Sequence, residues 1–449
     1  MSELSAVARR AVEAATAAGA GEAEAYVARE SGREVRVHGG EVESLTAAVQ
    51  GGVGIRAWIG HRVGYAFGTD LSDAGVAAIA ARAAEAARAA DEDRFAAPPA
   101  PAEAEALAGL SDSSVAGWTA AQVADLALSV ERTALAEARV VAVEQAVYAD
   151  SSEQVAIASS TGVAGEYESS SCFAYLQALA EGEGSRETGL GFGLARGPDG
   201  LDPEAIGAEG AARAVAMIGA VKPASRACPV VFDQTVAASF AGLLGGGLGA
   251  NAVQRGRSPF AGRLGEEVAS EAFALFDDGR DPEGPASAPF DGEGVPRRRT
   301  ALIEDGRLRT YLFDTYTATR GDAASTGSAS RQGYRSLPTV STSNLVVAPG
   351  SRSPEQLLAE AGDGILVTDV AGLHSGVNPV TGVFSVGASG RAIRDGQLAE
   401  PVREFTIAGD LVSMLRAVSA AGSDARWVPF GGSVRTPSLL ISELSISGS

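Results

Sequence analysis

The stretch EAEAYVARESGREVRVHGGEVESLTAAVQGGVGIRAWIGHRVGYAFG, residues 22–68, sets the expected fold class of this chain. Apolar and polar residues alternate along it in short runs, and glycine-containing turns separate the runs. Alternation with a period of two is typical of strands that bury one face of a sheet. The stretch therefore predicts an antiparallel meander of short strands.

Regions with helical spacing of apolar residues surround this meander. Helices are expected over residues 4–19, 70–90, 119–137 and 203–218, and further alternating strands over 140–180. Asp70 or Ser72 can cap the second of these helices, because a short polar side chain satisfies the free amides of a first helical turn. Together these elements predict an N-terminal α/β domain with an antiparallel sheet, which we place at residues 1–225.

The second half of the chain is richer in strands and tight turns. Two segments, IEDGRLRTYLF and IRDGQLAEPV, carry Asp-Gly pairs at Asp305-Gly306 and Asp395-Gly396. Asp-Gly supplies the positive φ angles of a type I′ turn, so each segment predicts a β-hairpin. Paired hairpins favour a strongly curved or barrel-like sheet, and we expect residues 226–449 to form a β-rich domain. The fold class is therefore α+β with two domains.

Composition excludes some partners. The 449 residues carry a formal charge of −20 and a pI near 4.7, whereas nucleic acids and anionic lipids are bound through Lys and Arg. We therefore expect no nucleic-acid or membrane partner. The N-terminus lacks the pattern of a signal peptide, and no apolar run approaches the roughly 20 residues that span a bilayer. The expected location is the cytoplasm.

Local motifs for hydrolytic chemistry are missing. His38, His61 and His374 are the three histidines, and none has a second histidine four or five positions on; a catalytic zinc usually needs about three convergent ligands. No G-x-S-x-G elbow is present. Cys172 and Cys228 have no neighbouring histidine, so two reduced, partly buried thiols are expected.

Two glycine-rich segments stand out. The run from Gly242 to Gly249 lacks the Lys and Ser/Thr of a P-loop and the spacing of a dinucleotide fold, so it predicts a helix packed closely against another backbone. The stretch from Gly372 to Gly390 is either a loop leading into a core strand or a strand edge that holds a peptide through main-chain hydrogen bonds. For that second possibility the candidate peptide-binding residues are His374, Ser375, Asn378, Thr381, Gly382, Phe384 and Ser385.

Along its whole length the chain resembles the TldD/PmbA proteins, also called modulators of DNA gyrase. The segments that carry this resemblance are GGEVESLTAAVQGGVGIRAWIGHRVGYAFGTDLS, SPFAGRLGEEVAS, DTYTATRG, STGSASR, SNLVVAPG, HSGVNPVTGVFSVGASG and REFTIAGDLVSMLRAV. The resemblance implies the two-domain fold and a dimer around an enclosed chamber. In that dimer a metal-bearing TldD-type subunit pairs with a TldE/PmbA-type subunit, and the complex cuts unfolded or short peptides.

The resemblance also implies where a metal would lie. TldD-type chains carry zinc on an H-E-x-x-x-H helix and a later cysteine. Alignment through Arg255-Gly256 and Ser258-Pro-Phe places Ala241 and Gly246 at the two histidine positions and Gly242 at the glutamate position. The cysteine position falls near residues 430–433, which are Phe-Gly-Gly-Ser. No metal ligand, catalytic residue or cofactor is therefore expected in this chain, and zinc is expected in a TldD-like partner.

These inferences give a leading hypothesis, a non-catalytic TldE/PmbA-like subunit of a TldD/TldE-type peptidase complex that acts in proteolysis or peptide maturation. A second hypothesis is a stand-alone peptidase or hydrolase with a non-zinc site around His374, Ser375 and Asn378. A third is a homodimeric scaffold that binds peptides for a separate enzyme. The partner is then either a TldD-like subunit or a second copy of the chain, and the peptide itself is not defined by the sequence.

Overall fold

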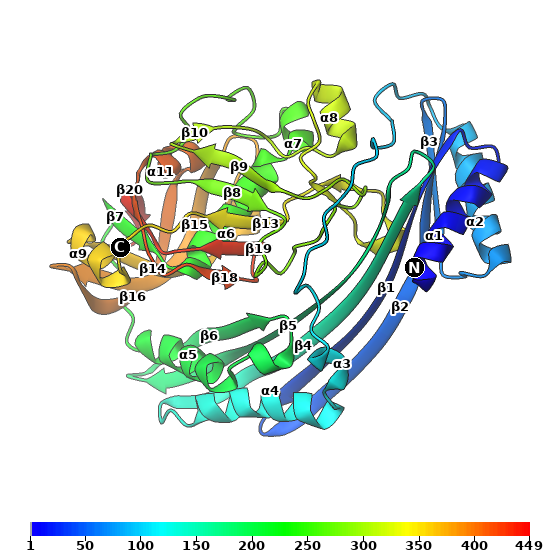
Figure 1. Cartoon of the computed structure of the whole chain (residues 1–449). Helices are drawn as coiled ribbons and strands as arrows, with labels where there is room; N and C mark the ends of the chain where they lie inside the picture. Colours follow the sequence, from blue (N-terminus) through cyan, green and yellow to red (C-terminus); the bar gives the residue numbers. More distant parts are fainter. Residues whose placement is uncertain (1) are drawn as a thin grey trace.

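The computed structural model describes residues 2–449 and divides into an N-terminal sheet with helices and a C-terminal β-rich part (Figure 1). The N-terminal helices are α1 (Glu3–Ala17), α2 (Asp73–Ala89), α3 (Ser114–Gly117), α4 (Ala120–Leu135), the 3-10 helix η1 (Pro198–Gly200) and α5 (Pro203–Ala216). The N-terminal strands are β1 (Glu22–His38), β2 (Glu41–Ile59), β3 (Arg62–Gly68), β4 (Val140–Ser159), β5 (Ala164–Gly182) and β6 (Ser185–Ala195).

The predicted helices are present, with ends within a few residues of expectation. Ser72 is the N-cap of α2 and accepts a hydrogen bond from the Gly75 amide, and Thr119 begins α4 with a capping box to Gln122. The expected division of residues 22–68 into short runs is wrong, because three strands cover it. Gly32 and Gly51 lie inside β1 and β2 instead of in turns.

The N-terminal strands form one antiparallel sheet in the order β3-β2-β1-β4-β5-β6. The chain passes twice through the same series, α1-β1-β2-β3-α2 and then α4-β4-β5-β6-α5, and β1 and β4 meet at the centre. The two halves are therefore related by an approximate twofold axis through the middle of the sheet. Strand β6 was not predicted from the sequence, because its glycines weaken the alternating pattern.

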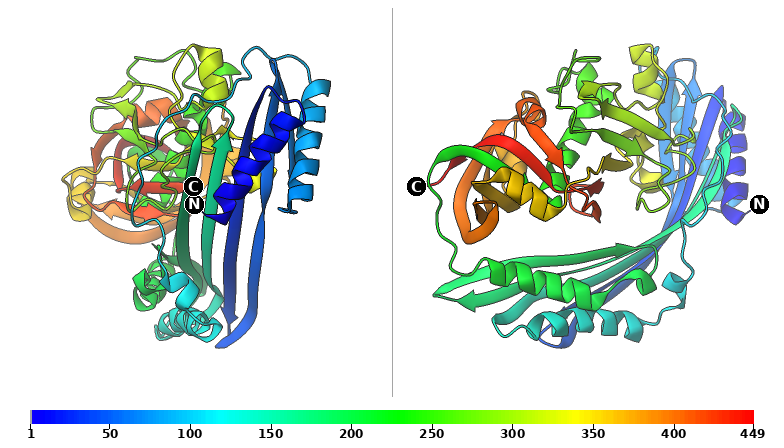
Figure 2. Two further views of the ribbon diagram at one scale, coloured as in Figure 1. Left: turned by 45° about the vertical axis from the view of Figure 1, so that its right-hand side comes forward. Right: turned by 60° about the vertical axis from the view of Figure 1, so that its left-hand side comes forward.

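One face of this sheet carries the helices. Val27 belongs to the core under α1 and α2, and Val35 and Val37 belong to the core under α4 and α5. Odd-numbered residues of one strand point to one face, so both helix pairs cover the same side. Tyr26 and Ala28 point to the other face and pack with Phe290 and Tyr334 of the C-terminal part. The sheet curves around the C-terminal part (Figures 1 and 2).

The C-terminal part begins after residues 217–225, which link α5 to β7. Its helices are α6 (Gln234–Leu248), α7 (Ala250–Gln254), α8 (Thr315–Gly321), η2 (Gly333–Arg335), α9 (Pro354–Ala361), α10 (Leu373–Gly376) and α11 (Leu411–Arg416). Its strands are β7 (Arg226–Phe232), β8 (Leu275–Asp278), β9 (Arg299–Glu304), β10 (Arg307–Leu308), β11 (Ala329–Ser330), β12 (Thr339–Val340), β13 (Asn344–Val347), β14 (Gly364–Ala371), β15 (Val383–Arg394), β16 (Gln397–Asp410), β17 (Val418–Ala421), β18 (Arg426–Val428), β19 (Ser433–Thr436) and β20 (Leu439–Ser447).

Strands β16, β15, β14, β7 and β20 close into a barrel, because β16 also pairs with β20. The β15–β16 hairpin turns at Asp395-Gly396, where both residues have positive φ. The other predicted hairpin, at Asp305-Gly306, joins β9 to β10 in a second sheet of order β10-β9-β8-β13-β19-β18. The α+β fold class and the barrel-like sheet are therefore confirmed, although only one of the two hairpins belongs to the barrel.

A buried ionic cluster joins the two parts. Arg56 of β2 donates to Glu24 of β1 at 2.6 Å and to Glu293 of the C-terminal part at 2.9 Å. Arg331 of the C-terminal part also donates to Glu24. Buried charges are tolerated when each has a partner of opposite sign, and here every partner lies across or beside the contact between the parts.

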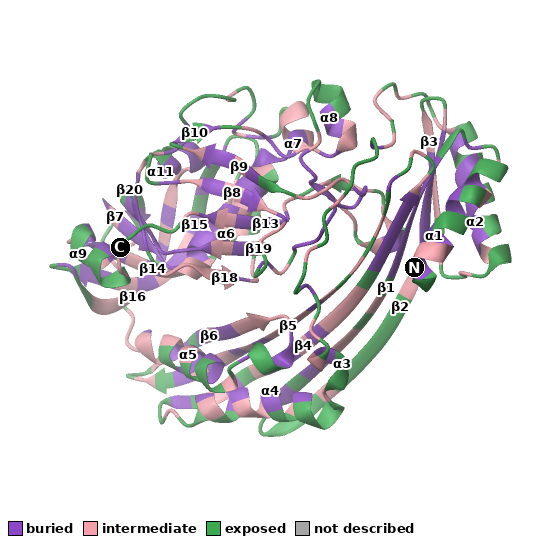
Figure 3. Ribbon diagram, in the orientation of Figure 1, coloured by how far each residue is buried: buried purple, intermediate pink, exposed green. Residues whose placement is uncertain are grey.

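Buried residues concentrate between α6 and the strands around it and on both faces of the N-terminal sheet (Figure 3). Among the helices of residues 2–449, none combines the length and the apolar character needed to cross a bilayer.

Candidate functional site

The helix α6 runs through the centre of the C-terminal part, between the barrel and the second sheet. Its N-cap, Asp233, accepts a hydrogen bond from the Val236 amide and pairs with Arg213 of α5 at 3.0 Å. Burial raises the pKa of Asp233 to about 6 even though Arg213 opposes that shift. On the core side of α6, Phe240 packs against Phe232 of β7 and Phe384 of β15.

The other side of α6 is made of glycines. A Cβ at Gly242 would lie 2.5 Å from the carbonyl oxygen of Gly431, and one at Gly245 would lie 2.7 Å from Leu345 and Thr342. Both distances are too short for a real Cβ, so glycine allows the close backbone packing predicted from the sequence. At Gly246, in contrast, no heavy atom lies within 4 Å of the Cβ position. This side of the helix is therefore packed at Gly242 and open at Gly246.

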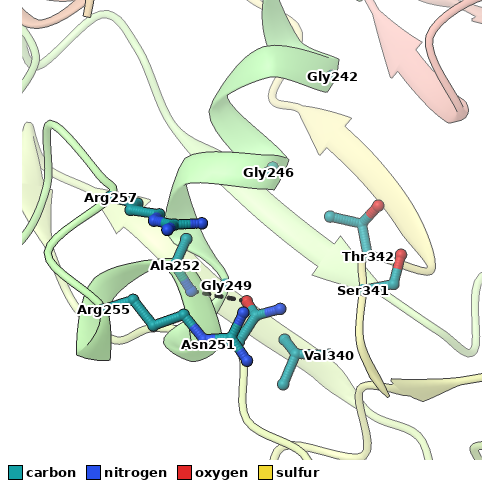
Figure 4. A pocket seen from close by; sticks show the side chains of 11 residues that line it. Gly242, Gly246, Gly249, Asn251, Ala252, Arg255, Arg257, Val340, Ser341 and Thr342 are labelled. Atoms are coloured by element: carbon teal, nitrogen blue, oxygen red, sulfur yellow. Dashed lines mark hydrogen bonds between the residues drawn. The ribbon is translucent and has the colours of Figure 1, made fainter. Parts of the chain in front are cut away.

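The open side of α6 faces a pocket of about 430 Å³ (Figure 4). The residues that line it are Gly242, Gly245, Gly246, Gly249, Asn251, Ala252, Arg255, Arg257, Val340, Ser341 and Thr342. Figure 4 shows Arg255 and Arg257 on one side of the pocket and Ser341 and Thr342 on the other, with the glycine helix behind them. The lining includes no Asp or Glu, although the chain has 56 of them.

A buried carboxylate holds the wall formed by Ser341 and Thr342. The next residue, Ser343, donates to Asp277 of β8 from its amide at 2.7 Å and from its hydroxyl at 3.0 Å. Burial raises the pKa of Asp277 to about 6, and Arg297 opposes the shift. The position of this wall therefore depends on hydrogen bonds to a group that is costly to bury as an anion.

The sequence-derived metal positions separate in the structure. Gly242 and Gly246 line the pocket, and Gly431 of the segment expected to match the later cysteine contacts Gly242. Ala241 does not line the pocket; it is 2% exposed and packs in the core on the other side of α6. Ala241 and Gly242 thus point to different sides of α6, because adjacent helical residues point about 100° apart, and the alignment of Ala241 with a histidine position stays a prediction.

The residues predicted to bind a peptide do not converge on a site. Phe384 is 1% exposed and packs edge-on against Phe240, so it is a core residue and not a contact for a ligand. Gly382 is also buried, with φ of 82°, and a Cβ there would meet Pro259 and Asp410. Phe384 is therefore corrected as a side-chain contact, since a ring that is closed in by the core cannot touch a peptide. A main-chain role of Gly382 stays a prediction.

The polar candidates in this loop mostly hold the loop itself. Asn378 accepts from the amides of Val380 at 2.9 Å and Thr381 at 3.1 Å, and Ser375 donates to the Gly372 carbonyl. The Thr381 hydroxyl accepts from the Val383 amide. His374 and Ser385 are exposed, and among residues 2–449 no hydrogen bond joins His374 to Ser375 or Asn378.

Most of strand β15 lies inside the barrel. Residues 383–394 pair with β16, but pairing with β14 covers only residues 387–393. Beside residues 383–386 the other side carries a single bridge, between Val377 and Phe384. Addition of a peptide strand needs unpaired backbone amides and carbonyls, and residues 387–393 have used theirs within the barrel. The predicted strand edge is therefore limited to residues 383–386, where it stays a prediction.

A larger cavity of about 820 Å³ lies between β6 and α5 on one side and the barrel on the other. Its walls include Asp233 with Arg213, and Glu187 with Arg403, whose ionic oxygen and nitrogen atoms lie 3.0 Å and 2.6 Å apart. These charges satisfy one another across the contact between the two parts. These two pairs are therefore not free to bind a charged ligand.

Neither thiol is poised for chemistry. Cys172 and Cys228 are free and buried, and burial raises the pKa of Cys172 to about 12 and also raises that of Cys228. Within residues 2–449 no three His, Cys, Asp or Glu side chains gather in a way that could hold a metal ion.

Comparison with known proteins defines the class first. Residues 23–88 match domain 1 of the PmbA/TldA metallopeptidases, residues 114–218 their central domain, and residues 225–448 their C-terminal domain. These segments follow one another as the two halves of the N-terminal sheet and the C-terminal part. The class is therefore that of the metallopeptidase-type proteins with this three-segment architecture.

Similar proteins then identify the family. The metalloprotease PmbA homolog of Haemophilus influenzae is 30% identical over 98% of this chain and 94% of that relative. The metalloprotease PmbA of Escherichia coli O157:H7 is 29% identical over 95% and 92%. TldE from Thermococcus kodakarensis shares the fold, with a TM-score of 0.91 and 23% identity over 98% of this chain and 100% of that one. The chain belongs to the PmbA/TldD family, and this membership supports a peptidase-related role.

The cationic and hydroxyl groups of the pocket were not predicted from the sequence. Arg255, Arg257, Ser341 and Thr342 line it, but they come from segments that are far apart in the chain. One local signal was present, because two arginines flank Gly256 directly after a long glycine-rich run in a strongly acidic protein.

Proposed function

We propose that this chain is a non-catalytic subunit of the TldE/PmbA type in a cytoplasmic peptidase assembly that acts on unfolded or short peptides. In this proposal a TldD-like subunit holds zinc and activates water, and this chain encloses the reaction space and contacts the peptide. The family membership supports the peptidase-related part. The non-catalytic part depends on the chemistry of the pocket beside α6.

The chemistry of the pocket lining is the observation that carries the proposal. Hydrolytic zinc sites use imidazole, carboxylate or thiolate ligands from about three residues. The pocket presents glycine Cα atoms at Gly242 and Gly246, an amide at Asn251, two hydroxyls and two guanidinium groups. None of these is a usual zinc ligand, and a guanidinium repels a cation. The residues present therefore do not fit a zinc ion.

The glycines also limit which metal ligands a substitution could introduce into the pocket. A histidine at position 242 would push against the Gly431 carbonyl, which lies 2.5 Å from the Cβ position. At position 246 a side chain has room, because no heavy atom lies within 4 Å. A single substitution would thus supply at most one ligand, and the chain's contribution to peptide cleavage is proposed to be structural.

The test compares the chain alone with the chain co-expressed with a TldD-like protein that carries H-E-x-x-x-H. Metal content is measured by elemental analysis, mass by light scattering, and cleavage with a fluorogenic unfolded polypeptide. We expect a mixed assembly in which zinc follows the partner and cleavage requires it. One zinc per chain together with cleavage by the isolated chain would refute the proposal.

A matched control separates a structural contribution from a catalytic one. In the assembly, replacing the first histidine of the partner's motif by alanine should abolish cleavage without preventing association. A homodimer that refuses the partner but binds peptides would instead favour the scaffold hypothesis. Light scattering of the two chains mixed in equal amounts distinguishes these results.

A further inference from the structure

The pocket beside α6 places two exposed arginines, Arg255 and Arg257, next to one another. Neither forms a hydrogen bond or an ion pair through its side chain with any other residue of the range 2–449. Some other exposed arginines are paired, as Arg352 is with Glu360 and Arg394 with Glu400. In a chain with a formal charge of −20, two unpaired arginines beside one pocket form a local positive site.

The other polar groups of the pocket can also donate hydrogen bonds. The Asn251 side-chain oxygen accepts from the Ala252 amide at 2.8 Å, which leaves the NH₂ group of Asn251 free to donate. The hydroxyls of Ser341 and Thr342 complete the opposite wall. A pocket with two cations, an amide donor, two hydroxyls and no carboxylate is complementary to an anion.

Size and shape restrict the anion further. The pocket holds about 430 Å³, which is within the range of sites for small organic ligands and larger than a bare inorganic ion needs. The glycine side of α6 gives a flat backbone surface at Gly246, where nothing lies within 4 Å of a Cβ position. A short peptide fits this pocket, because its carboxylate can contact the arginines and its main chain can lie against the open backbone at Gly246.

We propose that the pocket beside α6 binds a carboxylate of a short peptide, with Arg255 and Arg257 as its ionic partners and Asn251 as a further donor. The carboxylate is either the C-terminal one or that of an acidic side chain, since both present the same two oxygens to a guanidinium. The inference rests on the proposed peptide-related function and names the ligand chemistry of that site. In this chain the surface that corresponds to a metal site by resemblance thus holds an anion.

The test measures binding of N-terminally fluorescein-labelled tetra-alanine to the full-length chain by fluorescence anisotropy at low and moderate salt. Three probes are compared: the free acid, the C-terminal amide, and an amide with one alanine replaced by aspartate. We expect the free acid or the aspartate probe to bind at least about tenfold more tightly than the plain amide, because a charged hydrogen bond is lost with the carboxylate. Which of the two binds identifies the source of the carboxylate.

The double variant Arg255→Gln/Arg257→Gln should weaken binding of the preferred probe about tenfold or more and flatten its salt dependence. The matched control is Lys222→Gln/Arg263→Gln, which removes the same charge from two side chains that do not line the pocket and form no ion pair within residues 2–449. We expect the control to bind like the wild type. Thermal midpoints of both variants verify that they are folded.

Equal binding of all three probes, or unchanged binding by the Arg255→Gln/Arg257→Gln variant, would overturn the inference. Binding of inorganic phosphate without any binding of the peptides would overturn it as well. These failures can be told apart from failure of the proposed function. Association with a zinc-bearing partner and partner-dependent cleavage would remain even if the carboxylate had no effect.

Discussion

The two glycine-rich segments of the C-terminal part look alike in sequence and differ in the structure. In α6, Gly242 and Gly246 form one side of a pocket whose arginine side chains have no partner among residues 2–449. In the segment from Gly372 to Gly390, the polar groups of Asn378 and Ser375 bond to their own loop, and Phe384 is buried. The arginine side chains beside α6 are free to bind a ligand. Most polar side chains of residues 372–390 instead form hydrogen bonds within their own loop.

This difference shows what identifies a site in such a chain. Glycine permits close approach of any neighbour, whether that neighbour is a ligand or the protein's own backbone. The useful distinction is whether the polar groups nearby are satisfied by the fold. Hydrogen-bond donors without partners that line a cavity, with positive charge and no negative charge among them, indicate a ligand. Asn or Asp side chains that bond to their own loop indicate a structural role.

The largest expected effect tests whether Phe384 belongs to the core. Phe384→Ala should lower the free energy of unfolding by about 3 to 5 kcal/mol, because it removes a fully buried ring between β15 and α6. Chemical denaturation measures this change. Val383→Ala, at a neighbouring side chain that is 55% exposed, should cost less than about 1 kcal/mol. A stable Phe384→Ala protein with weakened peptide binding would place the ring in a binding site after all.

The next effect compares two glycines of the pocket side of α6. Gly242→Ala should destabilise the protein by about 2 kcal/mol, since its methyl group would lie 2.5 Å from the Gly431 oxygen and force a backbone shift. Gly246→Ala should instead stabilise it by about 0.5 to 1 kcal/mol, because alanine favours a helix and meets nothing within 4 Å. Thermal unfolding measures both. Equal effects of the two substitutions would mean that α6 is not packed on one side and open on the other.

A third effect concerns the pocket wall held by Asp277. Its pKa is about 6 in the folded protein and 3.8 for the free side chain, so the folded state binds more protons between these values. Stability from this group is therefore present below about pH 4 and is lost as pH rises through 6. Asp277→Asn keeps a hydrogen bond to the Ser343 amide and should gain up to about 2 kcal/mol relative to the wild type between pH 4 and 7.

The control for this pH effect has the opposite sign. Hydrogen bonds from Ser72 lower the pKa of Asp70, so Asp70→Asn should lose stability relative to the wild type as pH rises from the acidic end. Unfolding free energies at several pH values give both differences. A pH-independent difference for Asp277→Asn would show that this carboxyl titrates normally in the folded state.

Much of the fold could be predicted because its signals are local. Helix starts follow from caps such as Ser72 and Thr119, and the β15–β16 turn follows from Asp395-Gly396. Strand β6 was missed, since a Cβ at Gly189 or Gly191 would strike α5, and the glycines required there erase the alternating pattern. Closure of the barrel by β16 and β20 is a contact between distant residues, which no local pattern specifies.

The candidate site could be predicted only in part. Resemblance, and not spacing, pointed to Gly242 and to residues 430–433, and the structure brings Gly242 and Gly431 together. Arg255 and Arg257 are unpaired because the fold places no Asp or Glu in the lining of the pocket. A sequence shows the charges but not their pairing, so a positive pocket in an acidic chain becomes visible only in three dimensions.

The smallest effects test whether the polar side chains of residues 372–382 stabilise their own loop or bind a ligand. Asn378→Ala removes the acceptor for the Val380 and Thr381 amides and should lower the free energy of unfolding by only about 1 kcal/mol, because both hydrogen bonds lie near solvent.

His374→Ala should change neither the thermal midpoint nor the affinity for the tetra-alanine probes, since the imidazole is exposed and forms no hydrogen bond within the described residues. Both variants are measured beside the wild type in the same unfolding and anisotropy experiments. Loss of cleavage or of peptide binding in His374→Ala at unchanged stability would instead make this loop the functional one and would restore the stand-alone hydrolase hypothesis. The ranking of the two glycine-rich segments would then be reversed, because a satisfied loop would have proved more important for function than a pocket with unpaired charges.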